Sequence, residues 1–250
     1  MIRFEPHSDN EHIAICTLDR PEKRNALTVE MLETICECND YLSFKCKEAR
    51  VLLLHGEGRT FCAGFDLTEA KANPDITTPL LSSLSRACRA LRRLDIPVVG
   101  AVQGAAIAGG CALVSACDYV VANKDAKLGY PVVTLGISPA VTTPLLSRAI
   151  GRAHTRERVL DPGLIDATRG AQMGLLHRTV ESESDVFPAA LDAAGDFARK
   201  PLHSVRETKK WLNRLDNTHS DVDFDESLVR SIETARSERA HEALARIWKD

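Results

Sequence analysis

The stretch VVGAVQGAAIAGGCALVSACD, residues 98–118, decides how this chain folds. It begins with an apolar run, and we predict a buried strand over residues 97–102. Small residues then follow from Gly104 to Gly110 and lead into a helical pattern. Glycine lets a backbone approach another group closely, and the start of a helix leaves N–H groups without helix partners. The stretch therefore predicts a strand, a tight turn and a helix N-terminus that presents main-chain donors.

A second segment of the same kind is RTFCAGFDL, residues 59–67. It follows a predicted strand over residues 50–55 and precedes a helical pattern that begins near Leu67. Taken alone, each segment can also be interpreted as an ordinary connection between a strand and a helix, with Asp66 as a helix cap. Two such turns that face each other could hold one oxygen between two N–H groups, an oxyanion hole typically worth ~3–4 kcal/mol per donor.

Strands and helices alternate through the first part of the chain. We predict strands over residues 2–4 and 12–18, a helix that Thr28 caps and that runs to about residue 47, and a helix over residues 82–94. This alternation is typical of an α/β core with crossovers. From residue 142 onward helical segments dominate, over residues 142–150, 186–199, 202–215 and 224 to the end, with one strand over residues 175–180.

Composition and charge narrow the classes of function. The formal net charge of −3 gives no indication of nucleic acid or an anionic membrane as a partner. The charged start does not fit a signal peptide, and no apolar run reaches the length of a membrane span. The eight cysteines form no CxxC pair and show no zinc spacing, so we expect no metal site and interpret them as reduced, buried side chains of a cytoplasmic protein.

Several segments together resemble one family. They are LDRPEKRNAL at residues 18–27, FCAGFDL at 61–67, AVQG at 101–104, GGC at 109–111, ACD at 116–118 and GLL at 174–176. In this order and spacing they resemble the crotonase (enoyl-CoA hydratase/isomerase) superfamily, from about residue 13 to residue 180. The resemblance implies an α/β fold, a spiral of ββα repeats, over residues 1–195. It also implies a helical region, residues 196–250, that covers the active site and assembles the chain into a homotrimer or hexamer.

The resemblance also implies a site. It places the oxyanion hole at the N–H groups of Phe65 and Gly109, with coenzyme A entering as part of the acyl-CoA substrate and no tightly bound cofactor. Lys23 and Arg24 are candidates for the phosphates, although both could be solvated surface charges. The remaining positions implied to contact coenzyme A are Ala26 and Leu27, together with the backbone of Cys62, Ala63, Asp66 and Leu67.

The chain departs from the family at the positions that move protons. Hydratases of the family carry one glutamate in a GGGCE pattern and another in an FGxPE pattern; here Ala112 and Val132 stand in their places. The aspartate of the aryl-CoA dehalogenase branch is also missing from residues 136–140. Tyr130 borders the implied acyl pocket and is a candidate acid or base, with a packing role as the other interpretation. Cys111 is more simply interpreted as a buried hydrophobe.

Three hypotheses of function follow. The first is a lyase or isomerase of the enoyl-CoA hydratase/isomerase family, in fatty acid metabolism, that stabilises an enolate. The second is a related CoA thioester hydrolase or decarboxylase, because a β-carboxylate that leaves as CO2 generates an enolate without a side-chain base. The third is a non-catalytic acyl-CoA binding paralogue that retains the shape of the site.

Overall fold

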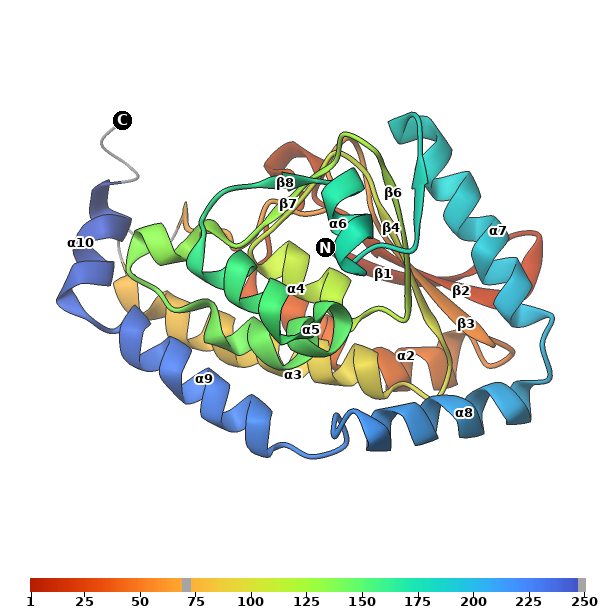
Figure 1. Ribbon diagram of the computed structural model, residues 1–250. Helices are drawn as coiled ribbons and strands as arrows, with labels where there is room; N and C mark the ends of the chain where they lie inside the picture. Colours follow the sequence, from red (N-terminus) through yellow and green to blue (C-terminus); the bar gives the residue numbers. More distant parts are fainter. Residues whose placement is uncertain (69–72, 247–250) are drawn as a thin grey trace.

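The computed structural model describes residues 1–68 and 73–246 of the chain (Figure 1). A six-stranded sheet with the order β1-β2-β3-β4-β6-β9 forms its centre. Only β1 and β2 pair antiparallel, and the other neighbours pair parallel. The strands are β1 (Ile2–His7), β2 (Asn10–Leu18), β3 (Val51–Gly56), β4 (Val98–Val102), β6 (Tyr119–Asn123) and β9 (Arg178–Val180).

A second, three-stranded sheet has the order β5-β7-β8. Its strands are β5 (Ala105–Ile107), β7 (Lys127–Gly129) and β8 (Ile165–Asp166). Only two residues separate β4 from β5, so the chain leaves the large sheet and enters the small one almost at once. A single residue separates β5 from the helix α4, so the small sheet fixes the position of the N-terminus of α4.

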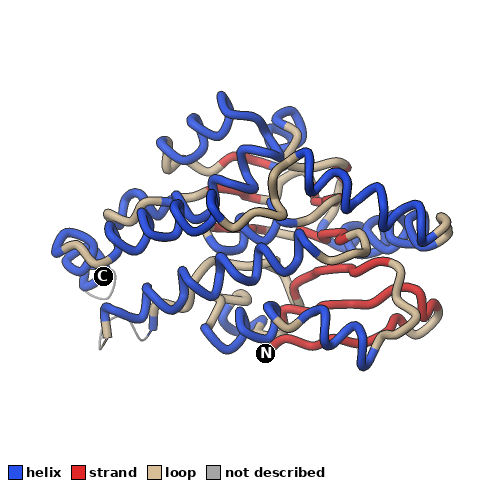
Figure 2. The backbone as a smooth tube through the Cα atoms, turned by 90° about the horizontal axis from the view of Figure 1, so that it is seen from below, coloured by secondary structure: helices blue, strands red, loops and turns tan. Residues whose placement is uncertain are grey.

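Helices cover both faces of the large sheet (Figures 1 and 2). One face packs against α7, through alanines such as Ala190 and Ala194. The opposite face carries the larger core, to which α1, α3, α4 and α5 contribute. The helices are α1 (Val29–Cys36), α2 (Cys38–Lys45), α3 (Thr77–Arg93), α4 (Gly109–Ala116), α5 (Thr143–Leu160), α6 (Ala167–Met173), α7 (Val186–Ala198), α8 (Leu202–Leu215), α9 (Val222–Ala235) and α10 (Glu238–Arg246).

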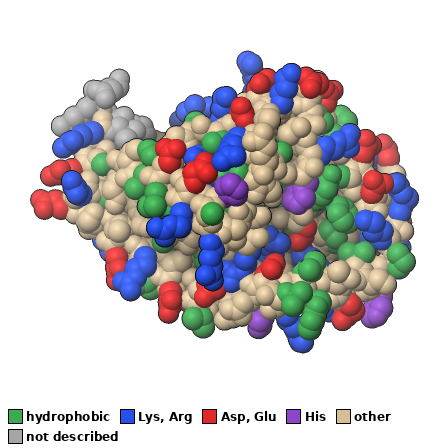
Figure 3. All heavy atoms as spheres, in the orientation of Figure 1, with side chains coloured by type: hydrophobic (Ala, Val, Ile, Leu, Met, Phe, Trp, Pro, Cys, Tyr) green, Lys and Arg blue, Asp and Glu red, His purple; other side chains and the backbone are tan. Residues whose placement is uncertain are grey.

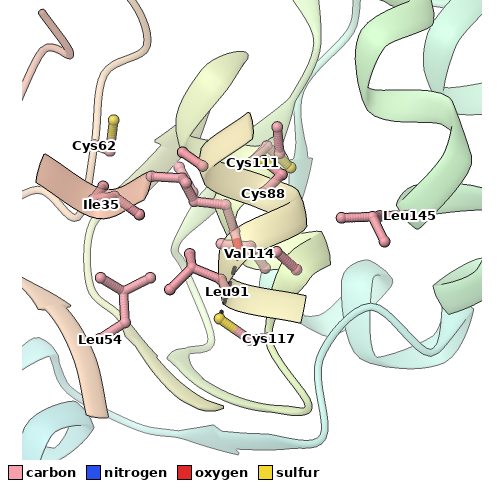
Figure 4. Close-up of a cluster of buried hydrophobic side chains, with 14 of the residues drawn as sticks. Ile35, Leu54, Cys62, Cys88, Leu91, Cys111, Val114, Cys117 and Leu145 are labelled. Carbon is pink, nitrogen blue, oxygen red and sulfur yellow. Dashed lines mark hydrogen bonds between the residues drawn. The ribbon is translucent and has the colours of Figure 1, made fainter. Parts of the chain in front are cut away.

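The larger core is continuous from the sheet to the helix α4 (Figure 4). Leu54 of β3, Leu91 of α3 and Val114 of α4 converge there, and all three are at most 2 % exposed. Cysteines fill the space between them as small apolar side chains. All eight cysteines lie in described residues as free thiols, and seven of them are buried, as the sequence predicted for these side chains.

Several local predictions are confirmed and others are wrong. Thr28 caps α1, with its hydroxyl accepting a hydrogen bond from the Met31 N–H at 3.2 Å. The single helix predicted from Thr28 to about residue 47 is two helices, which meet at Glu37. The strands β5, β6, β7 and β8 and the helix α6 were not predicted, because each is short and shows no clear period. The helix predicted to begin near Leu67 lies largely in residues 69–72, outside the described residues.

The C-terminal helices pack beside the core and along its edge. The predicted boundary between residues 195 and 196 falls inside α7, and the division of the chain into two regions stays a prediction. The helix α9 runs beside α3, and α10 lies next to the 3-10 helix η4 (Pro131–Leu135). Among the described residues, no helix is both long and apolar enough to cross a membrane.

Candidate active site

The two glycine-containing segments predicted from the sequence lie against each other. The Cys62 N–H donates to the Ala105 carbonyl at 3.0 Å, and the Ile107 N–H donates back to the Cys62 carbonyl at 2.9 Å. A Cβ atom at Gly110 would lie 2.7 Å from the carbonyl oxygen of Cys62. Only glycine fits there, so Gly110 brings the N-terminus of α4 directly onto the second segment.

The main-chain pairing beside Phe65 leaves the N–H group of that residue unpaired. The Leu27 N–H donates to the Gly64 carbonyl at 2.7 Å, and the Asp66 N–H donates to the Leu27 carbonyl at 2.8 Å. In this parallel bridge the N–H of Phe65 points away from Leu27. Gly109, the first residue of α4, has no helix partner for its N–H. Within the described part of the chain, neither N–H donates a hydrogen bond to a protein atom.

Both of these residues line one cavity of about 250 Å³. A Cβ atom at Gly109 would lie 3.2 Å from the ring of Phe65, so the two residues lie next to each other at the cavity wall. The other described lining residues are Ala63, Gly64, Leu67, Thr77, Leu81, Leu84, Ile107, Ala108, Tyr130, Pro131, Val132, Thr134, Leu135, Ile137, Ser138, Pro139, Val141 and Thr142. The cavity is therefore a mainly apolar space with main-chain donors at its wall.

The described lining contains no carboxylate, imidazole, amine or thiol. Val132 lines the cavity with an apolar side chain. Ala112, in the first turn of α4, is 1 % exposed and lies behind the cavity wall. Groups of three or more His, Cys, Asp or Glu residues that could hold a metal ion do not occur in residues 1–68 and 73–246. The site can donate hydrogen bonds to an oxygen, but its described wall offers little to carry a proton.

Tyr130 lines the cavity, but its hydroxyl group is bonded elsewhere. The hydroxyl donates to the Cys111 carbonyl at 3.2 Å and lies 3.1 Å from the Ser115 hydroxyl. Burial raises the pKa of Tyr130 well above its usual value, and it raises the pKa of Cys111 to about 11. These contacts favour a packing role, in which Tyr130 holds the first turn of α4 in place. Its role as an acid or base stays a prediction that the geometry does not favour.

Two residues to which the sequence analysis gave no role support the Phe65 segment. Arg20 forms an ion pair with Asp66 at 2.6 Å and also donates to the Ala26 carbonyl at 3.1 Å. The other oxygen of Asp66 accepts from the Thr68 N–H at 2.9 Å. Burial would raise the pKa of Asp66, but the hydrogen bonds from Thr68 and Arg20 outweigh burial and lower the pKa below its usual value. The residue after Phe65 is thus held from two sides.

Asn25 joins the same region to the loop that follows β3. Its side-chain amide donates to the carbonyls of Glu57 and Thr60 at 2.9 and 2.8 Å, and it accepts from the Arg20 N–H at 2.9 Å. Asn25 is fully buried and has a φ of 55°. The sequence shows Asn25 within the motif RNAL, residues 24–27, but it did not predict that the side chain is buried.

The residues predicted to contact coenzyme A separate into two groups. Ala63 and Leu67 line the cavity, and Arg24 and Ala26 are exposed or half-buried beside it. Asp66 is half-buried, and its carboxylate is already engaged. Leu27 and Cys62 are 0 % exposed, and both main-chain polar groups of each already have protein partners. For Leu27 and Cys62 the predicted contact stays a prediction that this burial and pairing do not favour.

The helix α9 holds the far wall of the cavity. The Ser231 hydroxyl donates to the Ser138 carbonyl and accepts from the Val141 N–H, both at 2.8 Å. The Thr234 hydroxyl accepts from the Ser138 N–H at 2.8 Å. These bonds fix the 3-10 helix η5 (Pro139–Thr142), which lines the cavity. The C-terminal region is therefore needed to complete the pocket.

A parallel β-bridge, an open helix N-terminus and an apolar cavity between them define a site built from main-chain donors. Residues 8–242 match the family model described as enoyl-CoA hydratase/isomerase, and the chain belongs to this family. It is 34 % identical over 208 residues to a protein of Bacillus subtilis, with 82 % of this chain and 79 % of the relative covered. It is 32 % identical to the 2,3-dehydroadipyl-CoA hydratase of Escherichia coli, with 83 % and 80 % covered.

Solved structures agree over the whole chain. An enoyl-CoA hydratase/isomerase from Xanthobacter autotrophicus is 27 % identical, with a TM-score of 0.85 and coverage of 100 % of this chain and 93 % of that one. OdaA of Pseudomonas aeruginosa is also 27 % identical, with a TM-score of 0.85 and coverage of 100 % and 99 %. The crotonase-like α/β fold expected from the sequence is confirmed.

Proposed function

We propose that this chain binds an acyl-CoA thioester and stabilises the enolate oxygen of that thioester with the N–H groups of Phe65 and Gly109. One observation carries the proposal: two N–H groups without protein partners lie at the wall of one apolar cavity. A water-excluding wall strengthens hydrogen bonds to a developing negative charge. The names of relatives support a CoA thioester as the ligand, since one is a 2,3-dehydroadipyl-CoA hydratase and another a mevalonyl-coenzyme A hydratase.

The acyl group would occupy the cavity, and coenzyme A would lie toward the exposed residues beside it. The cavity has a volume of about 250 Å³, far more than a single water molecule needs. That space fits a short or medium apolar acyl chain. Arg24 is exposed and adjacent in sequence to Asn25, which ties its loop to the site, and this exposure supports Arg24 as a phosphate contact.

Acetoacetyl-CoA tests this proposal without requiring turnover. Its enolate forms in water without an enzyme and absorbs in the near ultraviolet. We expect the protein to bind this thioester and to lower the pH at which the enolate absorbance appears, because two donors favour the charged oxygen. Binding without any change in that pH would contradict an oxyanion hole, and the absence of binding would contradict a thioester site.

A second candidate function is decarboxylation of a β-carboxyacyl-CoA. The observation that favours it is the described lining, which holds no side-chain base. In this reaction the bond between the α-carbon and the carboxylate breaks, its electron pair becomes the thioester enolate, and CO2 leaves. The enolate then takes a proton from water at the α-carbon. The step needs the two N–H donors and no carboxylate from the protein, whereas hydration or isomerisation of an enoyl thioester needs proton transfer by a side chain.

A panel of thioesters separates the candidates. We expect CO2 from methylmalonyl-CoA to be released faster than crotonyl-CoA is hydrated, with no release of free thiol beyond the buffer rate. Faster hydration than decarboxylation would favour the lyase or isomerase reading, and free thiol would favour a hydrolase. Glu69 lies outside the described residues, so Glu69→Gln is the control that detects a carboxylate from that part of the sequence. Binding without any turnover would identify a non-catalytic paralogue.

We also propose that the chain associates with copies of itself through α8. Trp211, Leu212 and Leu215 lie on this helix and are 59 %, 51 % and 64 % exposed. Figure 3 shows hydrophobic side chains along the lower edge of the molecule, where Figure 1 places α8. Large apolar side chains gathered on one exposed helix are typical of an interface. The free state of all eight cysteines supports a reducing, cytoplasmic location.

A further inference from the structure

Ala108 has a backbone conformation that an alanine rarely adopts. Its φ is 49° and its ψ is −110°, which lies outside the left-handed helical region near ψ of about 30–60°. This combination resembles the first central position of a type II′ turn, which is normally glycine. The family pattern GGGCE also has glycine where this chain has Ala108. A strained residue at this point calls for a reason.

Contacts on every side hold Ala108 in this conformation. Its N–H donates to the Gly129 carbonyl at 2.8 Å, and its carbonyl accepts from the Ala112 N–H at 2.9 Å. The methyl group faces Gly64, where a Cβ atom would lie 3.4 Å from it. The strand β5 ends at Ile107 and α4 begins at Gly109, so Ala108 alone makes the turn between them. Both of its peptide units are therefore fixed by neighbours.

The orientation of one peptide unit follows from these contacts. In a trans peptide the carbonyl and the next N–H point in opposite directions. The Ala108 carbonyl points into α4, toward the Ala112 N–H. The Gly109 N–H must therefore point out of the helix, and both residues line the cavity. With glycine at position 108 this peptide could rotate more freely, because glycine has far more allowed conformations than alanine.

We propose that Ala108 is a positioning residue whose strained turn and methyl group hold the Gly109 N–H on the ligand oxygen. The inference rests on the proposed function of the site. It assigns a role to a side chain that touches no reacting atom and acts only through the direction of one peptide. It further implies that stability and donor alignment oppose each other at this position, because relaxing the turn frees the donor.

The test is Ala108→Gly, observed by infrared spectroscopy of bound butyryl-CoA labelled with ¹³C at the thioester carbonyl. In the unchanged protein we expect the bound carbonyl band to move to lower wavenumber than in buffer. In Ala108→Gly we expect a smaller displacement and a broader band, together with a melting temperature that is equal or higher. A merely structural alanine would leave the band unchanged, so the band separates positioning from packing.

Asn217→Gly is the matched control. Asn217 also has a positive φ, 54°, but it follows the end of α8 and is exposed far from the cavity. We expect an equal or higher melting temperature and an unchanged carbonyl band. If Ala108→Gly shows the same band position and width as the unchanged protein, or melts lower, the positioning role is wrong. If the unchanged protein itself gives no displaced band, the proposed oxyanion hole fails instead.

Discussion

Proline at position 109 removes the N–H group of the first residue of α4, but its ring also crowds the methyl group of Ala108, whose ψ is −110°. Proline is tolerated at that helical position, where the missing N–H had no helix partner. Gly109→Pro therefore deletes one of the two proposed donors. A new Cβ atom would lie 3.1 Å from Leu27 and 3.2 Å from the ring of Phe65, so the substitution also crowds two side chains. Gly109→Ala adds the same Cβ carbon and keeps the N–H, which makes it the control for crowding by that carbon, and Ala108→Gly/Gly109→Pro, in which residue 108 has no methyl group, is the control for crowding of Ala108.

The expected magnitude follows from the cost of one donor. Loss of one oxyanion donor typically costs ~2.7–4 kcal/mol, and a change of one in pKa corresponds to about 1.36 kcal/mol. Full loss would raise the pKa of bound acetoacetyl-CoA by roughly 2–3, as an upper bound, since the neutral carbonyl also accepts the bond. We therefore expect that pKa to be at least about 1 higher in Gly109→Pro than in Gly109→Ala.

The assay is a pH titration of the enolate absorbance at saturating protein. Circular dichroism and a urea titration of both variants establish that each is folded. Equal pKa values of the bound thioester in folded Gly109→Pro and Gly109→Ala would refute the assignment of Gly109 as a donor. A raised pKa in Gly109→Ala alone would show that crowding of Phe65, and not the N–H, governs the site.

Other regions give predictions of different kinds. The pKa of Asp66 is lowered in the folded chain, so its contribution to stability is complete above the unfolded pKa of about 3.9 and is lost as the pH falls through the lower, folded value. In Asp66→Asn the urea midpoint should therefore fall less between pH 5 and pH 2 than in the unchanged protein. The buried amine of Lys209 lies 2.6 Å from Asp118, which keeps Arg92 at 3.3 Å, so Lys209→Met should lower the free energy of unfolding by about 2 kcal/mol in urea, with the pKa of bound acetoacetyl-CoA unchanged. Trp211→Glu should reduce the mass measured by light scattering, while Phe44→Glu, at an 82 % exposed aromatic on α2, should not; equal masses would exclude α8 as the interface.

Local signals in the sequence were sufficient for much of the fold. The apolar runs of β3 and β4 predicted strands covered on both faces, and both strands are almost completely buried. The bounds predicted for α8 agree with the structure, because Pro201 precedes the helix and charged residues mark its exposed side. Each of these features depends on neighbours within one element, which a single sequence contains.

Features that depend on distant residues could not be predicted in the same way. Asn25 is a buried centre of hydrogen bonds only because the loop after β3 folds over it. Leu27 and Cys62 are completely buried, since each pairs through its main chain with another segment. The conformation of Ala108 depends on Gly129 and Gly64, both distant in the sequence. The residue types at the site were readable, but their burial and direction were not.

In the proposed site the main chain supplies the hydrogen-bond donors, whereas proton transfer would require side chains. The proposed donors belong to the main chain, so no side-chain substitution at Ala112 or Val132 removes them. Proton transfer, in contrast, depends on side chains and is lost with them. A site whose described lining holds donors and no base can still stabilise an enolate that arises when a carbon–carbon bond breaks. It can do little for an enolate that requires removal of a proton from carbon, and this difference is why the decarboxylation assay, more than hydration, decides what the chain does.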